Sequence, residues 1–177
     1  MRTAKADIQD TVTLRPLTEA DVTPRYLGWF RDRQVTKYLE AQDLTKEEAT
    51  NYIRQQQQGG YFMYAIIVGG VHIGNLKIGP VWQEHGLADM VAVIGDAECR
   101  GQGYAAQAIA LGAGLAWNMG VRKISAGVYA ENTASLRAYL RAGFHVEGVL
   151  EEQYLLDGKP QDQVCIAMFN PALHNNR

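Results

Sequence analysis

The stretch from Glu98 to Gln107, ECRGQGYAAQ, contains the residue types of a phosphate-binding loop. Gly101 and Gly103 flank one polar residue, Arg100 precedes them, and a helix rich in small residues is predicted to follow. Glycine permits φ > 0 and lets a ligand approach the backbone closely. A glycine loop that opens a helix directs several N–H groups at one point, which favours phosphate. The chemistry of the chain therefore depends on which phosphate this loop binds.

The elements that must position this loop follow from periodicity. A strand is predicted over 12–17, and a helix with a Thr18/Asp21 capping box is predicted to run to about Phe30. The remaining segments favour a helix, a hairpin, a strand, a helix, a strand, a helix and a closing hairpin, over 44–58, 61–79, 88–95, 104–120, 122–130, 132–144 and 144–169. This order predicts a mixed α/β fold with a central, mostly antiparallel, twisted sheet flanked by helices.

Length and composition limit the classes of function. At 177 residues, 47% hydrophobic and 20% charged, the chain is expected to be one domain, 1–177, with its core over about 11–170. The net charge of −2 and the lack of a basic run argue against nucleic acid or an anionic membrane as partner. No apolar run of about 18 residues is present, and the first ten residues lack the apolar region of a signal peptide. We therefore expect a cytoplasmic protein, with a homodimer left open.

The two cysteines, Cys99 and Cys165, have no metal-ligand spacing, so no metal is expected. Nothing indicates that Cys99 is a nucleophile, because no histidine is visibly paired with it.

Three kinds of phosphate loop compete. A Walker loop requires G-x-x-x-x-G-K-[ST], which is missing. GQGYAA satisfies the dinucleotide pattern G-x-G-x-x-A, but an antiparallel meander precedes it and too little chain follows for a second mononucleotide-binding half. The third pattern, R/Q-x-x-G-x-G/A, is satisfied by RGQGYA, with Arg100, Gly103 and Ala105 in its fixed places.

Downstream, after one helix and one strand, NTASLRAYLRAGF resembles N-x-x-S-x-x-x-Y-x-K-x-G-F. Together with RGQGYA, in this order and spacing, it resembles the GNAT family of acetyl-CoA-dependent N-acetyltransferases. The resemblance runs from LRPLTEADV to IAMF, which is nearly the whole chain. LRPLTEADV, IGNLKIG and GFHVEG resemble the subgroup that contains ribosomal-protein N-terminal acetyltransferases and acetylases of small amines and nucleotide-linked amino sugars.

The resemblance implies that backbone N–H groups of the loop bind the pyrophosphate of acetyl-CoA, and that the preceding strand splays from its neighbour to bind the pantetheine arm. Asn132, Ser135 and Tyr139 are spaced i, i+3 and i+7, so they share one helix face that could follow the pantetheine. Asn132 also suits an N-cap, and Arg141 suits either the CoA phosphates or solvent. The implied cofactor-binding residues are Val93, Ile94, Gly95, Arg100, Gly101, Gln102, Gly103, Tyr104, Ala105, Asn132, Ser135 and Arg141.

The same resemblance makes Tyr139 the general acid that protonates the departing thiolate. The alternative for Tyr139 is core packing beside Leu136 and Leu140. No carboxylate stands within MVAVIG, so the candidate general bases are Asp89 at its start and Glu84 and His85 just before it. Deprotonation of the amine through water stays open.

The acceptor is expected between the N-terminal helices and the final hairpin, with Trp29, Phe30, Asp32, Tyr38 and Glu147 as candidate contacts. An aromatic wall with a carboxylate suits a sugar or an amine, although Trp29 and Phe30 also suit a core. The preferred acceptor is a small primary amine or a nucleotide-linked amino sugar. The alternatives are the α-amine of a protein N-terminus and a non-catalytic module that binds acyl-CoA.

Overall fold

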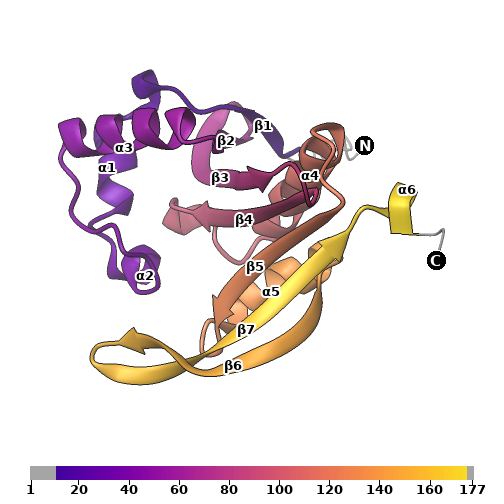
Figure 1. Ribbon diagram of the computed structural model, residues 1–177. Coiled ribbons are helices and arrows are strands. Elements are labelled where there is room, and N and C mark those ends of the chain that lie inside the picture. The colour runs from indigo at the N-terminus through magenta and orange to yellow at the C-terminus, as the bar shows by residue number, and fades with distance from the viewer. Residues whose placement is uncertain (1–10, 175–177) are drawn as a thin grey trace, which may run out of the picture.

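Seven strands form one sheet in the computed structural model, which describes residues 11–174. They are β1 (Thr13–Pro16), β2 (Phe62–Val68), β3 (Val71–Trp82), β4 (Leu87–Ile94), β5 (Lys123–Tyr129), β6 (His145–Leu156) and β7 (Lys159–Phe169). Their order in the sheet is β1-β2-β3-β4-β5-β7-β6 (Figure 1). Only β4 and β5 pair in parallel, and the other neighbours are antiparallel. The prediction of a mixed α/β fold with a mostly antiparallel sheet is confirmed.

The helices are η1 (Glu19–Asp21), α1 (Pro24–Trp29), α2 (Arg33–Thr36), α3 (Lys46–Gln58), η2 (Ala97–Cys99), α4 (Tyr104–Asn118), α5 (Thr133–Ala142) and α6 (Pro171–His174). Capping chemistry fixes where several of them begin and end. The Glu48 N–H donates to the Thr45 hydroxyl, and the Thr45 N–H donates to the Glu48 carboxylate, which forms a capping box on α3. Gly143, at φ 106°, ends α5 in the left-handed conformation that glycine adopts at little cost.

The N-terminal helical segment differs from the prediction. Instead of one helix running to about Phe30, η1 stops at Asp21 and α1 begins at Pro24. Proline has no N–H and a fixed φ, so it starts a helix more readily than it continues one. The short helix α2 was not predicted from the sequence. Asp32 caps it by accepting a hydrogen bond from the Gln34 N–H at 2.9 Å.

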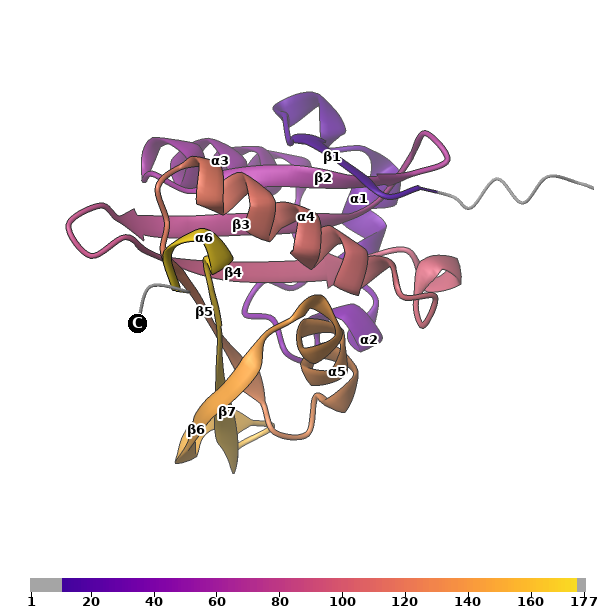
Figure 2. The same ribbon diagram turned by 90° about the vertical axis from the view of Figure 1, so that its right-hand side faces the viewer.

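Helices cover both faces of the sheet. Helices α4 and α5 lie on one face, and α1 and α3 lie on the other (Figures 1 and 2). The larger core lies between the sheet and the helices α4 and α5, and Leu76 and Ile109 are almost fully buried in it. Gly112 permits close packing of α4, since a Cβ there would lie 2.8 Å from Leu76 Cδ1. The second core lies between the sheet and the helices α1 and α3, and it contains Tyr26 and Trp29 of α1 and Ile53 of α3.

Strands β4 and β5 separate after a short paired segment. Pairing joins Leu87 to Lys123, Ala88 to Ile124 and Asp89 to Ser125, and stops there. Beyond these residues the two strands run apart (Figure 1). The separation leaves backbone groups of the second half of β4 without a partner strand on that side, which is the arrangement that the sequence resemblance implied.

No helix in the part of the chain from residue 11 to residue 174 is long and apolar enough to cross a membrane. Within the same residues, no three His, Cys, Asp or Glu side chains come together in a way that would hold a metal ion. Neither Cys99 nor Cys165 forms a disulfide.

Candidate active site

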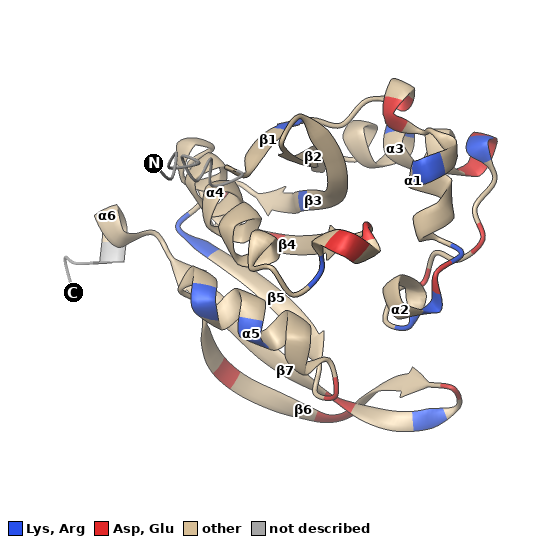
Figure 3. Cartoon of the chain, turned by 180° about the vertical axis from the view of Figure 1, so that it is seen from behind, with Lys and Arg blue, Asp and Glu red and all other residues tan. Residues whose placement is uncertain are grey.

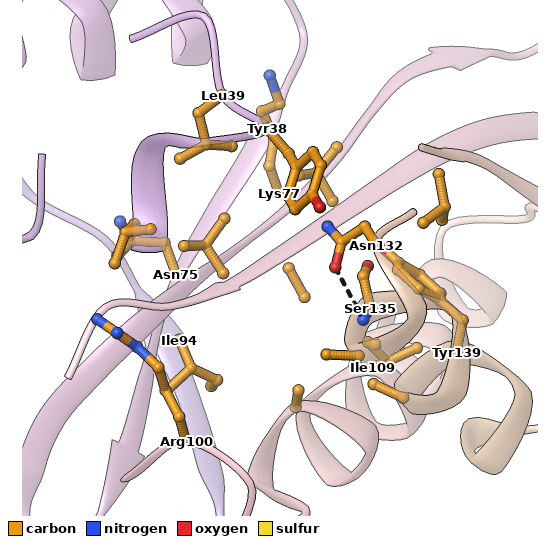
Figure 4. Close-up of a pocket in the computed structure, with 18 of the residues that line it drawn as sticks. Tyr38, Leu39, Asn75, Lys77, Ile94, Arg100, Ile109, Asn132, Ser135 and Tyr139 are labelled. Atoms are coloured by element: carbon orange, nitrogen blue, oxygen red, sulfur yellow. Dashed lines mark hydrogen bonds between the residues drawn. The ribbon is translucent and has the colours of Figure 1, made fainter. Parts of the chain in front are cut away.

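A pocket of about 1070 Å³ lies where β4 and β5 separate. We call one part of the pocket the loop end. It is formed by Ile94, the facing residues of α5 and the loop residues Arg100, Gly101, Gly103, Tyr104 and Ala105. We call the part formed by Tyr38, Lys77, Tyr129 and Tyr154 the tyrosine end. Figure 4 shows Asn132, Ser135 and Tyr139 grouped on one side of the pocket, with Arg100 and Ile94 at another.

The glycine loop has the conformation that its residue types predicted. Gly103 is the N-cap of α4 at φ 85°, and Gly101 lies at φ 74°. A Cβ at either position would meet no atom within 4 Å, so glycine is required for conformation and not to relieve crowding. Gly103 supplies no side-chain cap, and the first N–H groups of an α-helix have no acceptor within the helix. These donors, at the positive end of the helix dipole, suit an anion such as a diphosphate.

The Arg100 side chain crosses to α2. Its Nη2 donates to the Asp32 carboxylate at 2.6 Å and to the Gly95 carbonyl at 2.8 Å. Its Nη1 donates to Oε1 of Gln34 at 3.0 Å. The hydrogen bond from Arg100 lowers the pKa of Asp32 below its usual value. Asp32 does not line the pocket, and its carboxylate serves Arg100 and the start of α2.

Gly95 ends β4 at a close contact with α1. A Cβ there would lie 2.0 Å from Cδ2 of Trp29. Gly95, which the resemblance implied as a cofactor contact, therefore faces the Trp29 ring and does not line the pocket. Trp29 and Phe30 both line the pocket while packing on Tyr26, so the core and pocket interpretations of these two aromatic residues hold together.

Tyr139 lies at the point where β4 leaves β5. Its hydroxyl donates to the Met90 carbonyl at 2.9 Å, and its ring packs edge-on against Phe144. Burial raises the pKa of Tyr139 well above its usual value, so the phenol stays protonated through the physiological range. Tyr139 thus has a core contact and also lines the pocket, with its proton beside the separated strand.

The other α5 residues follow one face of the helix. The side-chain oxygen of Asn132 accepts the Ser135 N–H at 3.2 Å, so Asn132 is the N-cap of α5 and also lines the pocket (Figure 4). Arg141 lines the pocket together with Arg137, which sequence reasoning missed. The two arginines form basic bands on α5 (Figure 3). In the sequence, their spacing of four residues could have indicated that both arginines lie on the same face of a helix.

The three candidate bases occupy different places. Glu84 and His85 lie in the turn between β3 and β4 and do not line the pocket. Asp89 follows Ala88 and precedes Met90, which are both buried against the α4 side, so its side chain points to the opposite face of the sheet. Burial raises the pKa of Asp89, and the charge of Lys77 opposes that shift. Like Glu84 and His85, Asp89 does not line the pocket, and it is the one of the three candidates whose pKa responds to the charge of a tyrosine-end residue, Lys77.

The tyrosine end combines side chains from distant parts of the chain. The rings of Tyr38 and Tyr129 lie 5.2 Å apart, and Tyr154 stacks on Tyr129 at 4.3 Å between centroids. Lys77 donates to the Tyr52 hydroxyl and to Oε1 of Gln56, each at 3.2 Å. No ion pair joins Lys77 to a carboxylate among residues 11–174.

Most of the predicted site residues come together. Those that line the pocket are Trp29, Phe30, Tyr38, Val93, Ile94, Arg100, Gly101, Gly103, Tyr104, Ala105, Asn132, Ser135, Tyr139 and Arg141. Gln102 does not line it, and its side chain donates to the Glu98 carbonyl at 2.7 Å. Glu147 lies elsewhere on β6, where it pairs with Lys123 at 2.7 Å. Sequence reasoning missed Lys77, Tyr129 and Tyr154, since only their strand positions could have indicated them.

Comparison with known proteins matches this architecture to one family. The acetyltransferase (GNAT) domain matches residues 11–145, which is most of the chain. The chain belongs to this family.

Its relatives include a probable N-acetyltransferase, YjcK, of Bacillus subtilis, which is 32% identical over 72 residues, 40% of each chain. Similar solved structures include a spermidine N-acetyltransferase from Vibrio cholerae with CoA and spermine (TM-score 0.80, 20% identity, 90% of this chain and 95% of that one). A ribosomal-protein-alanine N-acetyltransferase from Brucella melitensis has a TM-score of 0.75 at 21% identity, and the match covers 89% of this chain and 99% of that one. The microcin C7 self-immunity acetyltransferase MccE, with acetyl-CoA and AMP, has a TM-score of 0.78 at 19% identity over 91% and 93%.

Membership of this family, with N-acetyltransferases among the relatives, supports an acyltransferase activity that depends on acetyl-CoA.

Proposed function

We propose that this chain transfers an acetyl group directly from acetyl-CoA to a primary amine, within a ternary complex. The preferred acceptor is a small amine or a nucleotide-linked amino sugar. The observation that carries this proposal is that Tyr139, beside Met90 where β4 leaves β5, and the glycine loop, which follows the end of β4, line the same pocket. This arrangement offers anion-binding N–H groups, unpaired strand backbone and one buried proton donor along a single pocket.

The loop end would hold the CoA phosphates. Backbone N–H groups of residues 101–105 are the donors, and Arg137 and Arg141 supply positive charge on α5. The unpaired backbone of Val93 and Ile94 would bind the pantetheine arm as an added strand binds a sheet edge.

The transfer moves one acetyl group and two protons. The amine nitrogen attacks the thioester carbonyl carbon, the C–N bond forms, and the C–S bond breaks with its electron pair on sulfur. Tyr139 gives its proton to the thiolate, and the amine loses a proton through water to Asp89, which does not itself line the pocket. Solvent then takes the proton from Asp89 and returns one to the Tyr139 phenolate, which restores both groups for the next cycle. The raised pKa of Tyr139 keeps the phenol protonated before the transfer but makes it a weaker acid than an exposed tyrosine. The raised pKa of Asp89 makes it a stronger base than an exposed aspartate.

Two features of the tyrosine end favour a ring-bearing, anionic acceptor over a polyamine. Tyr38, Tyr129 and Tyr154 offer a wall of aromatic faces, on which a sugar ring or a base packs well. Lys77 lies at the same end without an ion-pair partner among the described residues, so its ammonium would attract a phosphate. Glu40 also lines the pocket, and Asp89 and Glu40 both act on Tyr154, so carboxylates contribute the opposite charge at this end. The similar structure with acetyl-CoA and AMP is consistent with a nucleotide-linked acceptor.

The test is an assay of free-thiol release with acetyl-CoA and four acceptors: spermidine, glucosamine, a uridine-diphosphate-linked amino sugar, and a peptide with a free N-terminal alanine. Each product is identified by the mass of one added acetyl group. We expect the amino sugars to be acetylated faster than spermidine. Faster acetylation of the peptide would favour an N-terminal acetyltransferase. Tight CoA binding without an acetylated product from any amine would contradict the proposed enzyme and favour an acyl-CoA-binding module.

A further inference from the structure

The glycine loop is tied to the N-terminal helices by three contacts. The Trp29 ring covers Gly95, Arg25 of α1 pairs with Asp96, and Arg100 pairs with Asp32 at the start of α2. Gly95, Asp96 and Arg100 all belong to the segment that joins β4 to the loop. The segment that joins α1 to α3, in turn, carries Tyr38 of the tyrosine end.

The Arg100–Asp32 pair differs from an ordinary surface ion pair. The side chains of Arg100 and Asp32 are 24% and 35% exposed, whereas both members of the Arg54–Glu19 pair are about half exposed. The two terminal nitrogens of Arg100 donate to three acceptors on two segments, whereas its buried Nε has no hydrogen-bond partner among the described residues. Asp32 likewise serves two donors, since its other carboxylate oxygen caps α2 at the Gln34 N–H. An arginine held by several partners at fixed geometry positions its neighbours more firmly than an exposed pair does.

Resting on the proposed function, we infer that the Arg100 side chain is a positioning residue for the acceptor: it ties α2, and through α2 the Tyr38 wall, to the loop that binds acetyl-CoA. Its guanidinium serves Asp32 and Gln34 while the loop backbone serves the cofactor. The sequence pattern placed an arginine beside the CoA phosphates. In the structure, the Arg100 side chain instead points to Asp32 and Gln34, next to the residues that carry Tyr38.

The inference separates two effects that a phosphate-binding arginine would combine. Without the bridge, α2 loses its link to the loop, so Tyr38 is held less firmly and the acceptor is bound less well. The KM of the acceptor should rise by roughly three- to tenfold, the scale of one charge-assisted contact. The Kd of CoA should stay within about twofold of the parent value, because the N–H donors of residues 101–105 are unchanged.

The experiment is a double-mutant cycle on the full chain with Arg100→Gln, Asp32→Asn and both together. The pair Arg54→Gln and Glu19→Gln is the matched control, because it breaks an ion pair away from the pocket. Three quantities are measured: the Kd of CoA by calorimetry, hydrogen exchange of the amides of residues 33–39 with CoA saturating, and the KM of the best acceptor from the panel. Asp32→Glu, which keeps the charge, tests rescue, and melting curves confirm that each variant is folded.

We expect both single variants to speed exchange over 33–39 and to raise the acceptor KM. The double variant should do no more than either single one, since both remove the same bridge. The control pair should leave exchange over 33–39 unchanged. A Kd for CoA that rises tenfold or more in Arg100→Gln but not in Asp32→Asn would overturn the inference and assign the guanidinium to the cofactor. Unchanged exchange over 33–39 in both variants would also overturn it.

The exchange and calorimetric readouts keep the inference separate from the proposed function. If no amine in the panel is acetylated, the proposed function fails while exchange over 33–39 still decides the bridge. If the amines are acetylated but the cycle shows no coupling, the bridge is overturned and the proposed function stands.

Discussion

The two ends of the pocket are built from different kinds of groups, backbone at one end and side chains at the other. The loop end is built mainly from backbone groups of one continuous segment, residues 100–105, and from one face of α5. The tyrosine end is built from side chains that the turn after α2 and the strands β3, β5 and β6 bring together, including Tyr38, Lys77, Tyr129 and Tyr154. The difference indicates that the first end serves a ligand common to a whole family, while the second is free to vary with the acceptor.

The contrast predicts which property each substitution changes. A variant at the junction of the two ends should affect turnover, one in the loop should affect CoA binding, and one at the tyrosine end should affect the choice of acceptor.

Tyr139→Phe should have the largest effect. The variant keeps the ring and its packing on Phe144 but removes the proton donor. Turnover should fall by roughly 10²-fold or more, the usual scale for a positioned acid. Stability should fall by only about 1 kcal/mol, from the lost hydrogen bond to Met90. Steady-state kinetics and a melting curve measure both, with Tyr64→Phe, outside the pocket, as control.

The pH profile adds a second readout for Tyr139. An exposed phenol would lose its proton near pH 10. Because burial raises the pKa of Tyr139, the parent should keep its activity past that pH wherever it stays folded. Turnover of Tyr139→Phe within a few-fold of the parent would remove Tyr139 from the mechanism.

Asp89→Asn should lower kcat/KM by roughly 10- to 100-fold, with water taking over part of the deprotonation. Asp89 acts as a base only when it is ionised, so activity is lost as the pH falls through its pKa. Since burial raises that pKa, the acid limb of the parent should lie above about pH 3.9, the ordinary value for aspartate. The limb should disappear in Asp89→Asn. A normal rate for this variant with a defect in Glu84→Gln or His85→Gln would move the base to the β3–β4 turn.

Gly103→Val should weaken CoA binding by about tenfold or more and leave the acceptor preference unchanged. Gly103 lies at φ 85°, and a β-branched residue in that conformation costs about 1–3 kcal/mol or displaces the first N–H groups of α4. Calorimetry with CoA measures the change. The control is Gly158→Ala, at the tip of the β6–β7 hairpin. Gly114→Val would not serve, because Gly114 lies inside α4. Equal CoA affinity in a folded Gly103→Val protein would contradict the role of the loop.

Lys77→Met should have the smallest effect. The variant keeps an apolar stem against Tyr52 and Tyr61 and removes the charge. KM for an anionic amino sugar should rise by roughly three- to tenfold, with little change for glucosamine and none in CoA affinity. Lys77→Arg should retain the preference. Improved use of the anionic acceptor by Lys77→Met would contradict the charge argument.

The same contrast explains what the sequence could predict. The loop and the α5 face depend on contacts within a few residues, such as the Asn132 cap on Ser135, so their spacing was readable. Arg100 and Asp32 are separated by 68 residues, and only the folded sheet brings them together. Tyr129 and Tyr154 stack because β5 and β6 both pair with β7, a register that no local pattern specifies. The split of the first helix at Pro24 was readable in principle, since proline marks a helix start.

The most direct test of the central claim is calorimetric titration of the unsubstituted chain with CoA and, separately, with NAD. The pocket geometry predicts one CoA bound per chain, and NAD should bind much more weakly. The Lys77→Met variant should bind CoA as the parent does, because its charge lies at the tyrosine end. Saturable binding of NAD with no binding of CoA would contradict the assignment of the glycine loop, and with it the acetyltransferase mechanism.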